Sequence, residues 1–257
     1  MLTLNELFEE SMVWRKGWRW RGHASTPSGY APLNDQLPDS GWPKSGLSDF
    51  LITQSGIGEL RLLMPALSHL TQAEPRWLIW INPPHIPYAP ALLEQGIDLN
   101  KMLVIHAQTQ RDQLWAIEQC LKSSSCAAVL CWPPNMLNKD WRRLHLAAQT
   151  GKAWCVAFRP AHAARQPSPA PLRILLDHDN KGFFARVLKR PGGWTSENIY
   201  LTLPSPATPI RHFLESSPSY RQITLTYDRK ITPYSSDTHN EVDHAIAKEH
   251  MGLLPLS

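Results

Sequence analysis

The chain has 257 residues, a length that suits one middle-sized α/β domain with irregular ends. Hydrophobic residues make up 42% of it and charged residues 19%, a composition that excludes a chain disordered throughout. The net charge of +4 is too small to indicate a nucleic-acid binder by itself, because phosphate binding needs local clusters of Lys and Arg.

The first 43 residues are predicted to hold a short helix and an irregular linker. Thr3-Leu4-Asn5-Glu6 has the pattern of a capping box, and Leu7 and Phe8 follow at helical spacing. From Trp14 onward, tryptophans alternate with cations, and a stretch rich in Ser, Pro and Gly then runs to Pro43. We expect this linker to lie on the surface.

From residue 44 onward, short apolar runs alternate with segments that carry apolar residues on one helical face. Unbroken apolar runs are typical of strands buried on both faces. The predicted strands cover residues 47–52, 77–81, 102–105, 127–132 and 154–158, and the predicted helices cover 59–70, 88–95, 112–122 and 139–149. This alternation predicts right-handed βαβ crossovers, and therefore an α/β fold with a mostly parallel sheet and helices on both faces.

Two further runs, 172–177 and 183–189, lie close enough in sequence to form a hairpin that closes the sheet. After Pro191 the regular pattern fades because prolines interrupt it repeatedly. There we expect only a strand at 223–227 and a short helix at 240–251. The predicted units, listed by their limits, are an N-terminal helix with a Trp/Arg-rich linker (1–43), a core domain (44–190) and a Pro-rich, largely disordered tail (191–257).

Several kinds of site and location are not indicated by the sequence. The four cysteines include no Cys-x-x-Cys pair, so we expect reduced thiols in the core. The histidines show no ligand spacing, which predicts that no metal site is present. The N-terminal residues do not have the pattern of a signal sequence, and no apolar window approaches the ~20 residues of a membrane span. We therefore expect a cytoplasmic protein without membrane contact.

The turn after the first core strand lies where nucleotide-binding α/β proteins hold phosphate. A working loop ends in Gly-Lys-Ser/Thr, because the lysine neutralises the phosphates and the hydroxyl binds Mg²⁺. Here Gly56 and Gly58 are followed by Glu59 and Leu60, so a carboxylate and an apolar side chain replace these groups. We interpret the phosphate loop as degenerate and expect neither tight ATP binding nor a cofactor.

The middle of the chain, from Gly41 to the predicted hairpin, resembles RecA. In this comparison the motif Ile81-Asn82-Pro83-Pro84-His85 places Pro84 at the position of the catalytic glutamate. Trp132 follows the strand that presents the metal-associated aspartate in RecA. Together with Glu59, these replacements imply a RecA-like protein that has no catalytic residues and is not an enzyme.

Further motifs are similar to two bacterial families related to RecA. They are Trp20-Arg21-Gly22, Gly41-Trp42-Pro43, the run 56–63, Pro83-Pro84-His85, Phe158-Arg159-Pro160 and the long C-terminal region. Together they resemble ImuA, an accessory protein of SOS mutagenesis, whereas SulA, the SOS inhibitor of cell division, resembles the central part alone. The resemblance to ImuA implies an adaptor in error-prone translesion DNA synthesis. Its implied partners are ImuB, a catalytically dead relative of the Y-family polymerases, RecA and, indirectly, an error-prone DnaE-type polymerase.

Three segments are candidate contacts with a partner or, weakly, with single-stranded DNA. The N-terminal cluster can stack bases, anchor a protein or pack back onto its own domain. The loop after the fifth core strand either binds DNA or is a solvated connector, and the apolar C-terminal end either docks in a groove or has no function. The candidate residues are Trp14, Arg15, Trp18, Arg19, Trp20, Arg21, Arg159, His162, Arg165, Leu253, Leu254 and Leu256.

Three functions follow as hypotheses. The first is the ImuA-like adaptor, which predicts recovery of ImuB or RecA in a pull-down. The second is a SulA-like inhibitor of cell division that binds FtsZ, which predicts filamentous cells on overproduction. The third is a RecA-like ATPase or single-stranded DNA-binding module, which predicts nucleotide-stimulated turnover or salt-sensitive DNA binding.

Overall fold

A mixed sheet of nine strands lies at the centre of the computed structural model, which describes residues 25–134, 136–193, 195–203 and 221–225. The strand order is β10-β9-β8-β3-β7-β6-β4-β5-β11. The strands are β3 (Gly46–Ile52), β4 (Trp77–Ile81), β5 (Met102–Ala107), β6 (Cys126–Cys131), β7 (Trp154–Pro160), β8 (Leu172–Asp179), β9 (Gly182–Lys189), β10 (Ile199–Tyr200) and β11 (Arg221–Leu225). All neighbours from β8 to β11 are parallel, and the antiparallel pairs are β8 with β9 and β9 with β10.

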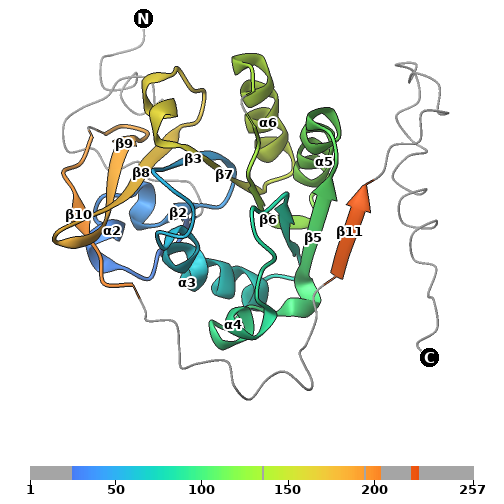
Figure 1. Cartoon of the computed structure of the whole chain (residues 1–257), viewed down its shortest axis with the longest axis horizontal. Helices are drawn as coiled ribbons and strands as arrows, with labels where there is room; N and C mark the ends of the chain where they lie inside the picture. Colours follow the sequence, from blue (N-terminus) through green and yellow to red (C-terminus); the bar gives the residue numbers. More distant parts are fainter. Residues whose placement is uncertain (1–24, 135, 194, 204–220, 226–257) are drawn as a thin grey trace, which may run out of the picture. The chain divides into compact units, whose positions relative to one another are not determined.

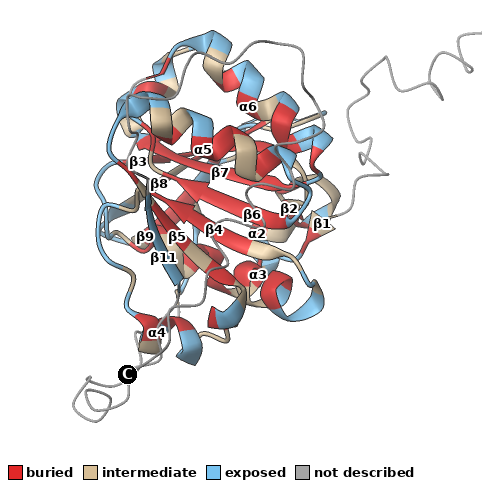
Figure 2. Ribbon diagram, turned by 90° about the vertical axis from the view of Figure 1, so that its right-hand side faces the viewer, coloured by how far each residue is buried: buried red, intermediate tan, exposed pale blue. Residues whose placement is uncertain are grey.

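Helices cover both faces of this sheet (Figures 1 and 2). On one face lie α3 (Glu59–Ala73) and α4 (Ala89–Glu94), and on the other lie α5 (Gln110–Lys122) and α6 (Asn138–Thr150). Each face has its own cluster of buried apolar side chains, because alternate residues of a strand point to opposite faces. The predicted α/β fold with a mostly parallel sheet and a closing hairpin is therefore confirmed.

Residues 25–46 form a small layer that packs against α3. The layer contains β1 (Ser25–Thr26), α2 (Ala31–Asn34), η1 (Pro38–Ser40) and β2 (Trp42–Pro43). Leu33 and Trp42 are fully buried, and the Trp42 ring stacks on that of Trp154 with a centroid distance of 5.6 Å. The prediction that this linker lies on the surface is wrong at these positions. The sequence did not predict this burial, because isolated apolar residues such as Leu33 and Trp42 show neither strand nor helix periodicity.

The predicted strand at 223–227 corresponds to β11, which runs parallel to β5 at the edge of the sheet. The predicted N-terminal helix and the predicted helix at 240–251 lie outside the described residues, as do the candidate contacts at 14–21 and 253–256. Within the described ranges, no helix combines the length and apolar character that crossing a membrane would need.

Candidate functional site

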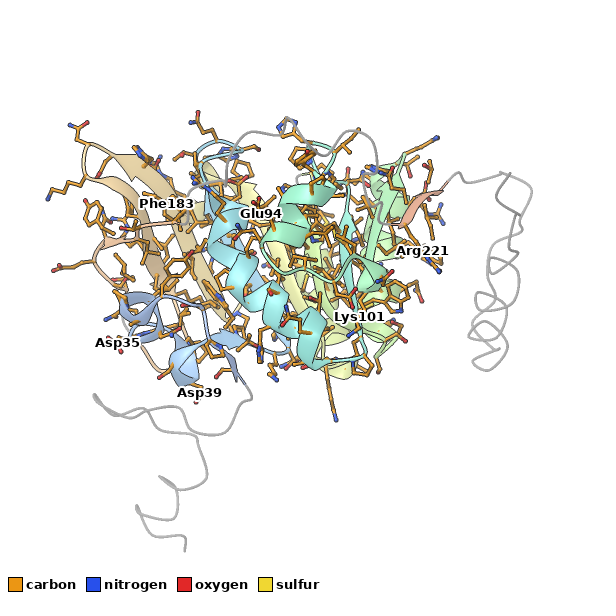
Figure 3. All side chains as sticks on the ribbon, turned by 90° about the horizontal axis from the view of Figure 1, so that it is seen from below. Asp35, Asp39, Glu94, Lys101, Phe183 and Arg221 are labelled. Carbon is orange, nitrogen blue, oxygen red and sulfur yellow. The ribbon has the colours of Figure 1, made fainter. Side chains whose placement is uncertain are left out.

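An apolar groove lies between α3 and α4, on the face of the sheet seen in Figure 3. It encloses about 200 Å³, and its walls are almost entirely apolar. Trp80 of β4 forms its floor and is buried, so the groove is anchored in the core. The walls come from Leu60, Arg61, Met64, Pro87, Tyr88, Ala91, Leu92 and Gln95.

Large apolar side chains project into solvent around α4. Ile86 is 78% exposed, Leu93 42% and Tyr88 39%, and all three lie within the segment that precedes and forms this short helix. Single exposed apolar residues are common on protein surfaces, whereas larger exposed apolar patches are typical of interaction sites. We call Ile86, Tyr88, Leu93 and the groove the α4 surface.

The C-terminal end of α4 is fastened to α3 by polar contacts. Ser68 Oγ donates a hydrogen bond to the Gly96 carbonyl oxygen at 3.0 Å, and Gln72 Nε2 donates to the same oxygen at 2.9 Å. Gly96 has a φ of +84°, and a Cβ there would lie 2.5 Å from Ser68 Oγ, so glycine is required by both conformation and space. These contacts hold α4 beside α3 and keep the groove in place.

The loop before α3 has the conformation of an anion-binding turn, but the chain's own carboxylate occupies its amides. The Gly56 amide donates to Glu59 Oε1 at 2.9 Å and to Oε2 at 3.1 Å, and the Gly58 amide donates to Oε2 at 3.1 Å. Glu59 is buried, and Gly56 and Gly58 have φ values of +86° and +118°, which glycine adopts readily. A phosphate at these amides would have to displace a buried carboxylate.

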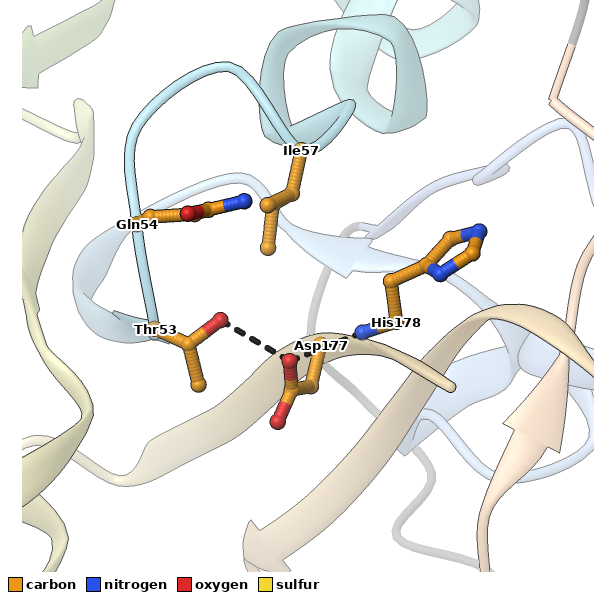
Figure 4. Close-up of a pocket in the computed structure, with 5 residues that line it drawn as sticks. All are labelled: Thr53, Gln54, Ile57, Asp177 and His178. Atoms are coloured by element: carbon orange, nitrogen blue, oxygen red, sulfur yellow. Dashed lines mark hydrogen bonds between the residues drawn. The ribbon is translucent and has the colours of Figure 1, made fainter. Parts of the chain in front are cut away.

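A second hollow lies beside the loop before α3, where residues of that loop and of β8 line it (Figure 4). Thr53, Gln54, Ile57, Asp177 and His178 line about 440 Å³ of open space, and Thr53 Oγ1 donates to Asp177 Oδ1 at 2.8 Å. Asp177 also accepts a hydrogen bond from the amide of His178 at 2.8 Å. This hollow is wide and open, and polar side chains line it together with Ile57.

The positions compared with the catalytic acids of RecA carry side chains that cannot hold a metal. Pro84 is exposed in the turn after β4. Trp132 stacks on Phe158 with a centroid distance of 4.8 Å and contacts the ring of Trp80. Among the residues that the structure describes, no group of three His, Cys, Asp or Glu side chains could hold a metal ion.

The loop candidates after β7 separate into one buried and two exposed residues. His162 and Arg165 lie in η3 (Ala161–Arg165) and are exposed. Arg159 is buried: its Nη1 donates to Asp49 Oδ2 at 2.9 Å, and its guanidinium lies 4.5 Å from the Trp141 ring centroid. Arg159 therefore stabilises the core and is not displayed to a partner or to DNA.

Asp49 holds a second arginine at the same carboxylate oxygen. Arg173 Nε donates to Asp49 Oδ2 at 3.2 Å, and its Nη2 donates to the Ala163 carbonyl oxygen at 2.8 Å. The cluster joins neighbouring strands of the sheet to η3, because Asp49 lies on β3, Arg159 on β7 and Arg173 on β8.

The sequence did not predict the residues of the α4 surface. Ile86 and Tyr88 lie among prolines, and large apolar residues in such a segment are a signal that could have indicated an exposed apolar surface.

The fold and the α4 surface define an α/β domain with an exposed apolar groove, and comparisons with known proteins relate it to one family. Residues 48–155 match the family model of the cell division inhibitor SulA. The SulA of Photorhabdus laumondii is 32% identical over 113 residues, which cover 44% of this chain and 63% of that protein. The SulA of Yersinia pestis is 28% identical over 138 residues, which cover 54% and 79%. The central part of the chain is therefore related to SulA.

Among solved structures, the chain is similar to the crystal structure of SulA from Pseudomonas aeruginosa. The sequences are 25% identical, and the match covers 44% of this chain and 97% of that one, with a TM-score of 0.38. The match to the Photorhabdus relative spans less than two thirds of its length.

These matches overturn the prediction of an ImuA-like adaptor in translesion synthesis. The curated relatives are named for inhibition of cell division, so the predicted partners ImuB, RecA, DnaE-type polymerase and single-stranded DNA are wrong, as is the description as a degenerate ATPase. The wrong prediction depended on motifs outside the matched region. The central motifs resemble both families, whereas Trp20-Arg21-Gly22 and the C-terminal region, which favoured ImuA, lie outside residues 48–155.

Proposed function

We propose that the protein inhibits cell division by binding FtsZ through the α4 surface. The observation that carries the proposal is the position of this exposed groove inside residues 48–155, the region related to proteins named cell division inhibitors. Inhibition by binding needs a surface that fits another protein and needs no catalytic group.

The α4 surface has the chemistry of a protein-binding site. When a partner covers exposed apolar side chains, their removal from water favours binding by roughly 25 cal/mol per Å² of apolar area. Ile86 and Leu93 are exposed just before and within α4, and Trp80, which lines the groove beside this helix, is already fixed in the core, so little ordering of Trp80 opposes binding there.

The protein acts in this proposal as a binder and not as an enzyme. Glu59 supports this inference, because its carboxylate accepts the hydrogen bonds of Gly56 and Gly58 that a phosphate would need. We infer more specifically that the loop before α3 binds no nucleoside triphosphate.

The test is assembly of purified FtsZ with GTP, followed by light scattering and pelleting, in the presence of the full-length protein. Ile86→Ser combined with Leu93→Ser removes the apolar projections of the α4 surface. A matched control exists on the opposite face: Leu137 and Leu146 are 63% and 61% exposed, at the start of α6 and within it. Leu137→Ser with Leu146→Ser therefore removes similar exposed apolar side chains from elsewhere.

The wild-type protein and the Leu137/Leu146 control are expected to suppress FtsZ assembly and to produce filamentous cells on overproduction. Half-maximal inhibition by the Ile86/Leu93 variant is expected to require a concentration at least about tenfold higher, because loss of an apolar anchor costs about 1–4 kcal/mol of binding free energy. Normal assembly with the wild-type protein would remove the proposed function. Equal inhibition by the two variants would remove the α4 surface as its site.

A further inference from the structure

The side chain of Asn82 holds the end of β4 to the neighbouring strand β5. Asn82 is the first residue after β4, and its main-chain amide donates to the Ile105 carbonyl oxygen at 2.9 Å. Its side chain continues the pairing: Nδ2 donates to the Ala107 carbonyl oxygen at 2.8 Å, and Oδ1 accepts from the Ala107 amide at 2.7 Å. The carboxamide therefore satisfies both main-chain polar groups of Ala107 beyond the last residue of β4.

The main chain turns away from the sheet at Asn82, where the side chain takes over the pairing. The φ of Asn82 is +51°, in the left-handed region that asparagine tolerates better than most residues with a side chain. The chain then runs through residues 83–88 to α4, and this segment carries Ile86 and Tyr88 of the α4 surface. The conformation and the two side-chain hydrogen bonds of Asn82 therefore set where the segment begins.

The segment between β4 and α4 has little conformational freedom of its own. Prolines at 83, 84, 87 and 90 each fix φ near −65°. At the far end of α4, the Gly96 carbonyl oxygen is bonded to Ser68 and Gln72 of α3. Because few φ angles between these ends can adjust, a displacement at Asn82 is expected to move Ile86 as well.

We propose that Asn82 is a positioning residue for the α4 surface, and that its carboxamide holds Ile86 and Tyr88 in the arrangement that binds FtsZ. The inference rests on the proposed function for the identity of the partner, whereas the hold on the segment can be measured without FtsZ. A segment that is ordered before binding loses little conformational entropy on binding. Loosening it should therefore weaken binding although every contact residue remains.

Two variants remove the hydrogen bonds in different ways. Asn82→Gly removes both bonds and adopts a positive φ without strain. Asn82→Asp keeps the size of the side chain and the acceptor for the Ala107 amide, but it places an oxygen opposite the Ala107 carbonyl oxygen. Ser124→Gly is the matched control, because Ser124 has a φ of +56° in the turn before β6, at the other end of these parallel strands.

The first measurement is hydrogen exchange of each free full-length protein, followed by mass spectrometry. In both Asn82 variants the amides of residues 85–95 are expected to exchange about tenfold faster, because a partly buried hydrogen-bonding group loses its partner. Exchange in α5 and α6 should match that of the wild-type protein. A residue that only added global stability would instead speed up exchange throughout the domain.

The second measurement is the FtsZ assembly assay, with urea unfolding to show that each variant is folded under its conditions. The concentration for half-maximal inhibition is expected to rise about tenfold for Asn82→Gly and Asn82→Asp, in step with the faster local exchange. Ser124→Gly is expected to inhibit like the wild-type protein.

Two results would overturn the proposal. One is unchanged exchange at residues 85–95 in both Asn82 variants, whatever the FtsZ assay shows. The other is faster exchange in this segment together with wild-type inhibition. Absence of inhibition by the wild-type protein would remove the proposed function instead, and exchange of the free protein would still show whether Asn82 holds the segment.

Discussion

Substitution of Asp49 by Asn tests whether the buried ion cluster stabilises the domain. The Asp49 side chain is fully buried, and its Oδ2 lies 2.9 Å from Arg159 Nη1 and 3.2 Å from Arg173 Nε. Asn keeps the size and one acceptor oxygen but removes the charge, which leaves two guanidinium groups that are only 6% and 9% exposed without a counter-ion.

The magnitude follows from the burial of all partners. Removing one member of a buried pair costs about 3–5 kcal/mol, and the retained amide oxygen places Asp49→Asn near 3 kcal/mol, at the lower end. At roughly 2–4 °C per kcal/mol for a domain of this size, the melting temperature should fall by about 6–12 °C. Such a loss is a large fraction of a typical stability of about 5–15 kcal/mol.

The assay is urea unfolding followed by tryptophan fluorescence, with Glu118→Gln as a matched control. Glu118 also pairs with two cations, Lys122 Nζ at 2.9 Å and Arg143 Nη2 at 2.6 Å; its own side chain is 10% exposed, but those of Lys122 and Arg143 are half exposed. Pairs whose cations remain in contact with water contribute about 0–1 kcal/mol, so this variant should remain close to wild type. Equal stability of the two variants would refute the argument that burial makes the Asp49 cluster important.

Further predictions address the core, the partly buried His145 and the loop before α3. Trp42→Ala should destabilise the protein by about 3–5 kcal/mol in the same urea assay, because a fully buried indole leaves a cavity; a loss below about 1 kcal/mol would place residues 25–46 outside the core. Burial, reinforced by the charge of Lys189, lowers the pKa of His145, whose Nδ1 accepts a hydrogen bond from the amide of Leu47 at 3.2 Å. The unfolded chain therefore binds this proton more tightly, so stability should fall as pH drops below 6.5, and His145→Gln should flatten that pH dependence; an unchanged pH profile would contradict this. Calorimetry with ATP and Mg²⁺ should show no binding to the wild-type protein, whereas Mg·ATP binding that survives Glu59→Gln unchanged would contradict the role given to Glu59.

Much of the sheet could be predicted from the sequence because its strands are buried on both faces and appear as unbroken apolar runs. The run 127–132 predicted β6 to within one residue at each end, and the short apolar runs at 172–177 and 183–189 predicted the hairpin. Leu33 and Trp42 escaped because their burial depends on contacts with distant residues such as Trp154, which no local period reveals.

The site was harder to predict, since exposure is a property of the folded surface. Arg159 follows an apolar strand and has the sequence pattern of a loop cation, but Asp49, 110 positions away, pairs with it in the core. Ile86 and Leu93 have the opposite property: they are apolar residues that the fold leaves in solvent. Neither outcome follows from residue type or spacing alone.

The most direct test of the proposed function is hydrogen exchange of the full-length protein with and without purified FtsZ. We predict slower exchange on binding for the amides of residues 86–95, with exchange in α5 and α6 unchanged. Protection confined to α5, α6 or η3, or no protection at any segment, would contradict the claim that the protein binds FtsZ through the α4 surface.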